Sequence, residues 1–97
     1  MAGDRAVVLV SAVCIWEAAI KSALGKLRVP DDLPSLLDQF AFERLPISDA
    51  HAWRVRDLPP VHQDPFDRLL AAQALCEQAT VVSADAIFDS YAVPRVW

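Results

Sequence analysis

Three acidic residues have the types and positions needed to hold a metal ion together: Glu17, Asp67 and Asp85. One lies in a helix that follows a predicted strand, one at the start of a later helix, and one shortly after a second predicted strand. In a parallel sheet such positions can meet at one edge, where open α/β folds bind their ligands. Unpaired carboxylates there would repel one another, and hard divalent cations relieve that repulsion. Two such cations about 3.5–4 Å apart can activate a water and stabilise the leaving oxygen of a phosphodiester.

Each acid also has a purely structural explanation. Asp67 could cap its own helix together with Asp64, which is worth about 1 kcal/mol. Glu17 could pair with Lys21 one turn later, a common surface ion pair worth about 0.2–0.5 kcal/mol. Asp85 could cap the helical turn that follows it. Taken one at a time, these roles explain the residues at least as well as catalysis does, and only the combination of the acids favours a metal site.

The hydrophobic pattern predicts the elements that must position these acids. Short β-branched apolar runs predict buried strands at residues 6–10 and 80–83, and Pro46 marks residues 45–47 as an edge strand. Apolar spacing and capping signals predict helices at residues 13–24, from 31 to about 42, from Ser48 to before Pro59, from Asp64 to about Gln78, and as a short turn near residues 87–88. Gly25 stands where a left-handed residue would end the first helix. This alternation predicts an α/β fold with a mainly parallel sheet and right-handed crossovers.

The length and composition limit what the chain can be. Its 97 residues contain no Ser/Gly-rich linker and no shift of composition, so we expect a single domain over residues 1–97. No apolar run approaches the roughly 18 residues that a membrane span needs, and the start lacks a signal-peptide core. We therefore expect a cytoplasmic protein without a membrane partner. Cys14 and Cys76 have apolar neighbours and no metal-ligand spacing, which predicts two buried free thiols.

The net charge of −4 argues against simple electrostatic capture of nucleic acid, which is driven by clustered Lys and Arg. If RNA is the substrate, bound metal ions, a basic partner or a dimer surface must offset the acids. Arg68 could contact phosphate, pair with an acid or be solvated. His51 and His62 are assigned no role as a base, because a two-metal hydrolytic site does not require one and both are expected in ordinary polar surroundings.

Three segments of the sequence, in the same order, resemble PIN domains of the VapC toxin type. They are Ser11–Leu27 with Glu17, His62–Ala74 with Asp67, and Ser83–Trp97 with Asp85. The resemblance covers essentially the whole chain and implies a PIN-like three-layer α/β fold. It also implies that Glu17, Asp67 and Asp85 bind Mg²⁺ or Mn²⁺ and are the catalytic residues of an endoribonuclease that hydrolyses RNA. A homodimer and a cognate VapB-like antitoxin are the partners that it implies.

The start of the sequence departs from the family pattern. Family members usually begin with a central strand that ends in a metal-binding aspartate, followed by a helix, whereas this sequence begins after both. We therefore expect the central first strand to be missing and the metal site to be one ligand short. Asp4 cannot take that role, because it precedes a predicted strand instead of ending one. Cys14 also stands where the family frequently has a serine.

Two other functions fit parts of the pattern. A degenerate PIN protein would bind an antitoxin-like partner through its apolar helices without cutting RNA, and the missing first acid favours it. A receiver-like domain would hold Mg²⁺ around a phosphorylated aspartate. That domain needs an acid at the end of a central strand and a lysine near the last strands, and neither is visible in the sequence, so it ranks last.

Overall fold

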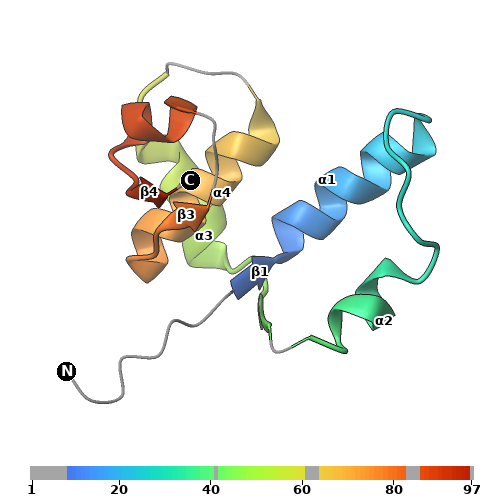
Figure 1. The fold of residues 1–97 in the computed structure, drawn as a ribbon. Coiled ribbons are helices and arrows are strands. Elements are labelled where there is room, and N and C mark those ends of the chain that lie inside the picture. Colours follow the sequence, from blue (N-terminus) through green and yellow to red (C-terminus); the bar gives the residue numbers. More distant parts are fainter. Residues whose placement is uncertain (1–8, 41, 61–63, 83–85, 97) are drawn as a thin grey trace, which may run out of the picture. The chain divides into compact units, whose positions relative to one another are not determined.

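The computed structural model describes residues 9–40, 42–60, 64–82 and 86–96, which belong to two compact units, Met1–Pro46 and Ile47–Trp97. Each unit combines helices with a pair of parallel strands (Figure 1). The predicted α/β class with parallel strands is therefore confirmed. Within the described ranges, no helix has the length and apolar character that crossing a bilayer requires.

The first unit is built around one strand that leads directly into one helix. Its elements, in order, are β1 (Leu9–Ser11), α1 (Ala12–Ala23), α2 (Leu33–Leu37) and β2 (Glu43–Leu45). β1 and β2 pair in parallel over their whole length. Ser11 is the N-cap of α1, and its hydroxyl oxygen accepts a hydrogen bond from the Val13 N–H at 3.0 Å. Just beyond α1, Gly25 takes a left-handed φ of 73°, so the predicted glycine stop is confirmed.

Helix α2 is shorter than predicted, because it ends at Leu37 instead of near residue 42. The chain then continues through two turns, in which the N–H groups of Gln39 and Phe40 donate to the carbonyls three residues earlier. Arg44 on β2 holds the end of the helix, since its guanidinium donates to the Pro34 carbonyl and to the Asp38 carboxylate, both at 2.7 Å. The Pro34 carbonyl also accepts the Asp38 N–H at 3.3 Å, so Arg44 adds a second donor to a carbonyl at the end of the helix.

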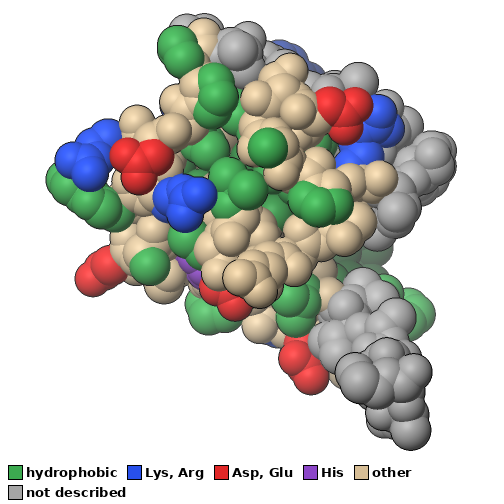
Figure 2. Space-filling view, turned by 90° about the vertical axis from the view of Figure 1, so that its left-hand side faces the viewer, with side chains coloured by type: hydrophobic (Ala, Val, Ile, Leu, Met, Phe, Trp, Pro, Cys, Tyr) green, Lys and Arg blue, Asp and Glu red, His purple; other side chains and the backbone are tan. Residues whose placement is uncertain are grey.

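The apolar stripe on α1 is largely exposed. Trp16, Ile20 and Leu24 are 42%, 37% and 63% exposed, whereas Val13 beside the strand is 1% exposed. Cys14 is also exposed and Cys76 is half-buried, so the prediction of two buried thiols is wrong for Cys14. On the face that Figure 2 shows, which is not that of α1, hydrophobic side chains also lie open among charged ones. The periodicity of α1 was identified correctly, but only its first turn is covered.

The second unit has its own apolar core. Its elements are α3 (Asp49–Arg54), the 3-10 helix η1 (Val55–Asp57), α4 (Pro65–Glu77), β3 (Val81–Val82), the 3-10 helix η2 (Ala86–Tyr91) and β4 (Arg95–Val96). β3 and β4 pair in parallel. The buried core residues come from α4, η2 and the neighbouring segments: Leu58, Ala71, Ala72, Ala74, Val81, Phe88, Tyr91 and Val93. Small alanine side chains on α4 leave room for the two aromatic rings, as close packing requires.

Capping residues fix where α3 and α4 begin. The Ser48 hydroxyl accepts a hydrogen bond from the His51 N–H, and the His51 ring accepts one from the Ser48 N–H, which completes a capping box. Asp64 caps α4, with Pro65 at the first helical position as predicted. Gln78 ends α4 in a left-handed conformation with φ of 54°. The sequence signals for both helix starts are therefore confirmed.

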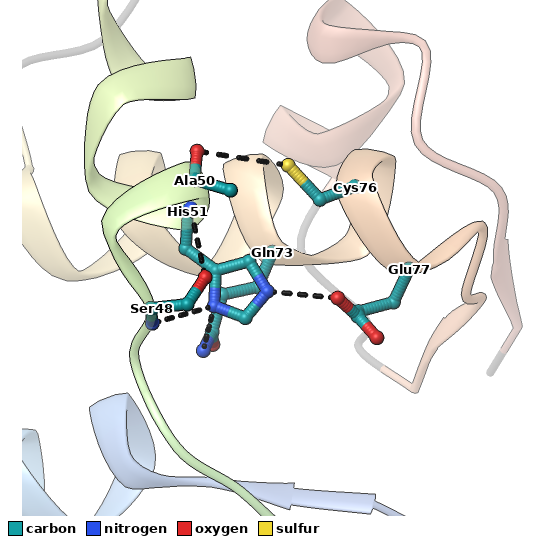
Figure 3. Close-up of polar contacts among 6 residues, drawn as sticks. All are labelled: Ser48, Ala50, His51, Gln73, Cys76 and Glu77. Carbon is teal, nitrogen blue, oxygen red and sulfur yellow. Dashed lines mark hydrogen bonds and ion pairs between the residues drawn. The ribbon is translucent and has the colours of Figure 1, made fainter.

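A buried polar cluster joins α3 to α4 (Figure 3). His51 is 3% exposed and Gln73 is fully buried. The His51 Nδ1 accepts from the Ser48 backbone N–H at 3.1 Å and lies 3.2 Å from the Gln73 Nε2. Because a backbone N–H can only donate, Nδ1 carries no proton and Nε2 donates to the Glu77 carboxylate at 2.9 Å. Both ring nitrogens have partners, which offsets the cost of burying them.

Candidate metal-binding acids

Glu17 lies in the second turn of α1, in the first unit, and is half-buried. Its Oε2 is 2.9 Å from the Lys21 Nζ, so the ion pair that the sequence offered as an alternative is present. The two side chains are 30% and 48% exposed, and pairs of this kind contribute only about 0.2–0.5 kcal/mol. The ion pair therefore accounts for a glutamate at this position, but it is weak enough for a stronger ligand to displace Lys21.

The charge of Glu17 also affects Cys14 in the preceding turn. Desolvation of the thiol raises the pKa of Cys14 above its usual value, and the nearby Glu17 carboxylate raises it further. Cys14 as a residue is exposed, so solvent screens much of this effect. A raised pKa favours the thiol over the thiolate, and the thiol is the poorer nucleophile and metal ligand.

Asp67 occupies the third position of α4, in the second unit, and is half-buried. The cap of this helix comes from Asp64, whose Oδ1 accepts from the Phe66 N–H at 2.8 Å and from the Asp67 N–H at 3.3 Å. Capping by Asp64 is confirmed, and the α4 cap therefore does not need the Asp67 carboxylate. The positive end of the helix dipole favours a negative charge at this point. Asp67 thus has a position suited to a metal ligand.

The convergence of the acids remains a prediction. Asp85 lies outside the described residues, and η2 begins at the next residue of the sequence. Glu17 belongs to the first compact unit and Asp67 to the second, and the two units are described separately. In the part of the chain that the structure describes, no group of three or more His, Cys, Asp or Glu side chains is arranged to hold a metal.

Arg68 has a structural role that the sequence did not indicate. Its guanidinium donates to the Pro59 carbonyl at 2.8 Å and to the Val55 carbonyl at 3.3 Å. The same group lies over the Tyr91 ring, 5.9 Å from the centroid, within the range of a cation–π interaction. Arg68 is therefore not a freely solvated arginine. Sequence reasoning missed these contacts because the carbonyl acceptors are backbone atoms and carry no residue-type signal.

His51 is the second residue whose role the sequence missed. It was expected in ordinary polar surroundings, but it is buried and joins two helices. The sequence did contain a signal for its local role, because Ser48 is followed three residues later by His51, whose ring can accept a hydrogen bond. Capping boxes normally have Glu or Gln at that position. His62 lies outside the described residues. Both ring nitrogens of His51 are engaged in hydrogen bonds within this cluster.

Comparisons with known proteins agree with this fold. The PIN domain family model matches residues 1–94, and the chain therefore belongs to the PIN-domain family. A crystal structure of VapBC2 from Rickettsia felis bound to a DNA fragment from their promoter is similar in fold, with a TM-score of 0.69 and 19% sequence identity. The similarity covers 93% of this chain and 74% of that chain. Among curated proteins, none matches the sequence.

Proposed function

We propose that the chain is a toxin-type endoribonuclease that hydrolyses RNA with Mg²⁺ or Mn²⁺ bound by Glu17, Asp67 and Asp85. Membership of a family of nucleases supports the reaction class. The observation that carries the proposal is the match of the PIN domain family model to residues 1–94, which include all three acids. Within the described residues, Asp67 lies in the first turn of α4, where Asp64 accepts the capping N–H groups and the helix dipole favours a negative charge.

The donor chemistry of the proposed ligands fits the proposed metals. Three carboxylates offer only oxygen donors, which Mg²⁺ and Mn²⁺ prefer over nitrogen or sulfur. Bound divalent cations would supply an activated water and charge stabilisation for the leaving oxygen. The chain's own part is to hold the ligands: α4 presents Asp67 at its N-terminal turn, and α1 presents Glu17 from its second turn. Lys21 would have to release Glu17 when a cation binds.

The proposal includes a VapB-like antitoxin and a homodimer as partners. The similar crystal structure contains such a toxin–antitoxin pair, which supports the first partner. The exposed apolar side chains of α1 support a protein partner in general, because apolar patches on monomers are usually small. On the face in Figure 2, basic side chains have acidic neighbours and form no continuous basic patch among the described residues. Metal ions or a basic partner would therefore have to offset the net charge of −4 near RNA. The cytoplasm remains the predicted location.

RNA cleavage by the purified chain tests the proposal. We expect slow cleavage of single-stranded RNA with Mg²⁺ or Mn²⁺, because the expected metal site is one ligand short of the family pattern. Cleavage should be lost with EDTA and in Asp67→Asn, because the amide cannot provide a charged metal ligand. Asp57→Asn is the matched control, since Asp57 is an exposed aspartate that pairs with Arg56 at 3.6 Å. Cleavage that persists in Asp67→Asn at the rate of the control would remove Asp67 from the mechanism.

The second candidate is a PIN protein that binds an antitoxin-like partner but does not cut RNA. The ion pair of Glu17 with Lys21 favours it, because a carboxylate with a lysine partner needs no metal. This candidate predicts no cleavage at any Mn²⁺ concentration together with a stable complex with a VapB-like protein in gel filtration. The two candidates therefore differ in a single cleavage assay.

A further inference from the structure

We propose that Arg68 is a positioning residue, which sets the place of Asp67 relative to the segment that follows Asp85. The inference rests on the proposed metal site and deepens it, because it assigns a role to a side chain that binds neither metal nor RNA. Arg68 is the next residue after Asp67 in the first turn of α4. A side chain that fixes this turn therefore also fixes the backbone that carries Asp67.

The first part of the argument is the contact of Arg68 with the segment before α4. Two of its nitrogens donate to carbonyls on either side of Leu58, to Val55 at 3.3 Å and to Pro59 at 2.8 Å. The Val55 carbonyl also accepts the Leu58 N–H at 3.2 Å, so Arg68 contacts the first residue of η1 at the carbonyl that closes this turn. Leu58 itself is 6% exposed and belongs to the apolar core. The guanidinium thereby ties the start of α4 to a part of the second unit that is anchored in the core.

The second part is the contact of Arg68 with η2. The guanidinium lies over the ring of Tyr91, which is 2% exposed and closes η2. η2 begins at Ala86, directly after Asp85 in the sequence. One guanidinium therefore contacts η1 and also η2, the helical turn that follows Asp85 in the sequence. Its backbone lies next to that of Asp67 in the first turn of α4.

The geometry of these contacts depends on a guanidinium. Its fork of donors can reach two carbonyls at once and its flat face can stack on a ring, whereas the lysine ammonium is a compact point charge. Lysine would keep the positive charge that an RNA phosphate contact needs, but it would lose the paired carbonyl contacts. Arg68→Lys therefore separates a positioning role from a role in binding phosphate. Arg68→Met removes the charge as well and retains a long apolar stem.

The test has two measurements on the same proteins. Mn²⁺ affinity is measured by titration, in which electron paramagnetic resonance detects the free Mn²⁺. RNA cleavage kinetics give the KM for RNA. For both Arg68→Lys and Arg68→Met we expect Mn²⁺ affinity to fall about tenfold or more, the loss typical of removing a residue that orients a metal ligand. The KM for RNA should stay near its original value at saturating Mn²⁺. Arg54→Met, which changes an exposed arginine on α3, is the control and should retain Mn²⁺ affinity. Circular dichroism and melting temperature establish that each variant is folded at the assay temperature.

The alternatives give different results. If Arg68 contacts RNA phosphate, Arg68→Lys should keep a KM for RNA near that of the unaltered protein. Arg68→Met should raise this KM and weaken the salt dependence of RNA binding, and neither variant should change Mn²⁺ affinity. That outcome overturns the inference, as does unchanged Mn²⁺ affinity in both folded variants. If the unaltered chain binds no Mn²⁺, the proposed metal site and the inference fail together. Mn²⁺ binding without RNA cleavage, weakened by both Arg68 variants, would support the inference while the proposed nuclease activity fails.

Discussion

At the scale of single residues, Glu17 and Asp67 each have a neighbour that bears on their role. Glu17 has Lys21, whose Nζ lies at 2.9 Å, and Asp67 has Asp64, which takes over the helix cap. The sequence offered both neighbours as structural alternatives to catalysis. The structure confirms the Glu17 pair and shows that the cap of α4 is satisfied by Asp64. A metal that binds Glu17 would therefore have to displace Lys21.

This exchange leads to a prediction for Lys21→Met. A lysine that competes with the metal for Glu17 should weaken metal binding, so its removal is expected to raise Mn²⁺ affinity by roughly twofold, the equivalent of an exposed ion pair of about 0.2–0.5 kcal/mol. Thermal stability should hardly change, because both side chains are partly exposed. Glu17→Gln should instead lower Mn²⁺ affinity by more than this factor. Isothermal titration with Mn²⁺ on the three proteins decides the matter, and equal affinities would remove Glu17 from the metal site.

At the scale of elements, capping chemistry made the helix starts predictable. Ser48, Asp64 and Pro65 are local signals whose partners lie within three residues, so sequence alone identified them. The end of α2 was not predictable in this way, because Arg44 reaches it from β2 through a backbone carbonyl and an aspartate. The same distinction explains why His51 was missed. Its capping bond is local, but its contacts to Gln73 and Glu77 cross from one helix to another.

The α3–α4 cluster gives a prediction at this scale. His51→Ala would leave the Gln73 amide and the Ser48 N–H without their ring partner and would open a cavity, which should cost about 2–4 kcal/mol of unfolding free energy. In His51→Gln the glutamine can still accept a hydrogen bond from the Ser48 N–H, as in ordinary capping boxes. This variant should therefore lose less unfolding free energy than His51→Ala. Glu77→Ala should cost under about 1 kcal/mol, because this carboxylate is 41% exposed.

Urea unfolding of these variants followed by circular dichroism provides the comparison. The expected order of stability is Glu77→Ala above His51→Gln, with His51→Ala the least stable. If His51→Ala unfolds at the same urea concentration as the unaltered protein, the cluster does not hold α3 to α4. A cost for Glu77→Ala as large as that for His51→Ala would instead place most of the stabilisation in the ion pair.

At the scale of the whole molecule, sequence reasoning identified the α/β class and the family but not the burial of α1. Hydrophobic periodicity predicts which face of a helix is apolar, and it carries no information on whether another element covers that face. Trp16, Ile20 and Leu24 follow the predicted spacing and are exposed. The candidate site shares this limit, since its acids come from both compact units and their approach depends on long-range packing. Residue types and family motifs could nominate Glu17, Asp67 and Asp85, but spacing could not fix their distances.

The central claim is that these three acids bind one or two divalent cations together, and paramagnetic Mn²⁺ tests it most directly. In a nitrogen–proton NMR spectrum of the chain, Mn²⁺ well below one equivalent broadens the amide signals nearest to its binding site. We predict that the signals around Glu17, Asp67 and Asp85 weaken together at the same Mn²⁺ concentration, and that excess Mg²⁺ restores them. Asp67→Asn should abolish the broadening at all three places, because the carboxylates act as one site. Broadening confined to one of the three regions, or broadening that Asp67→Asn leaves unchanged, would contradict a shared metal site.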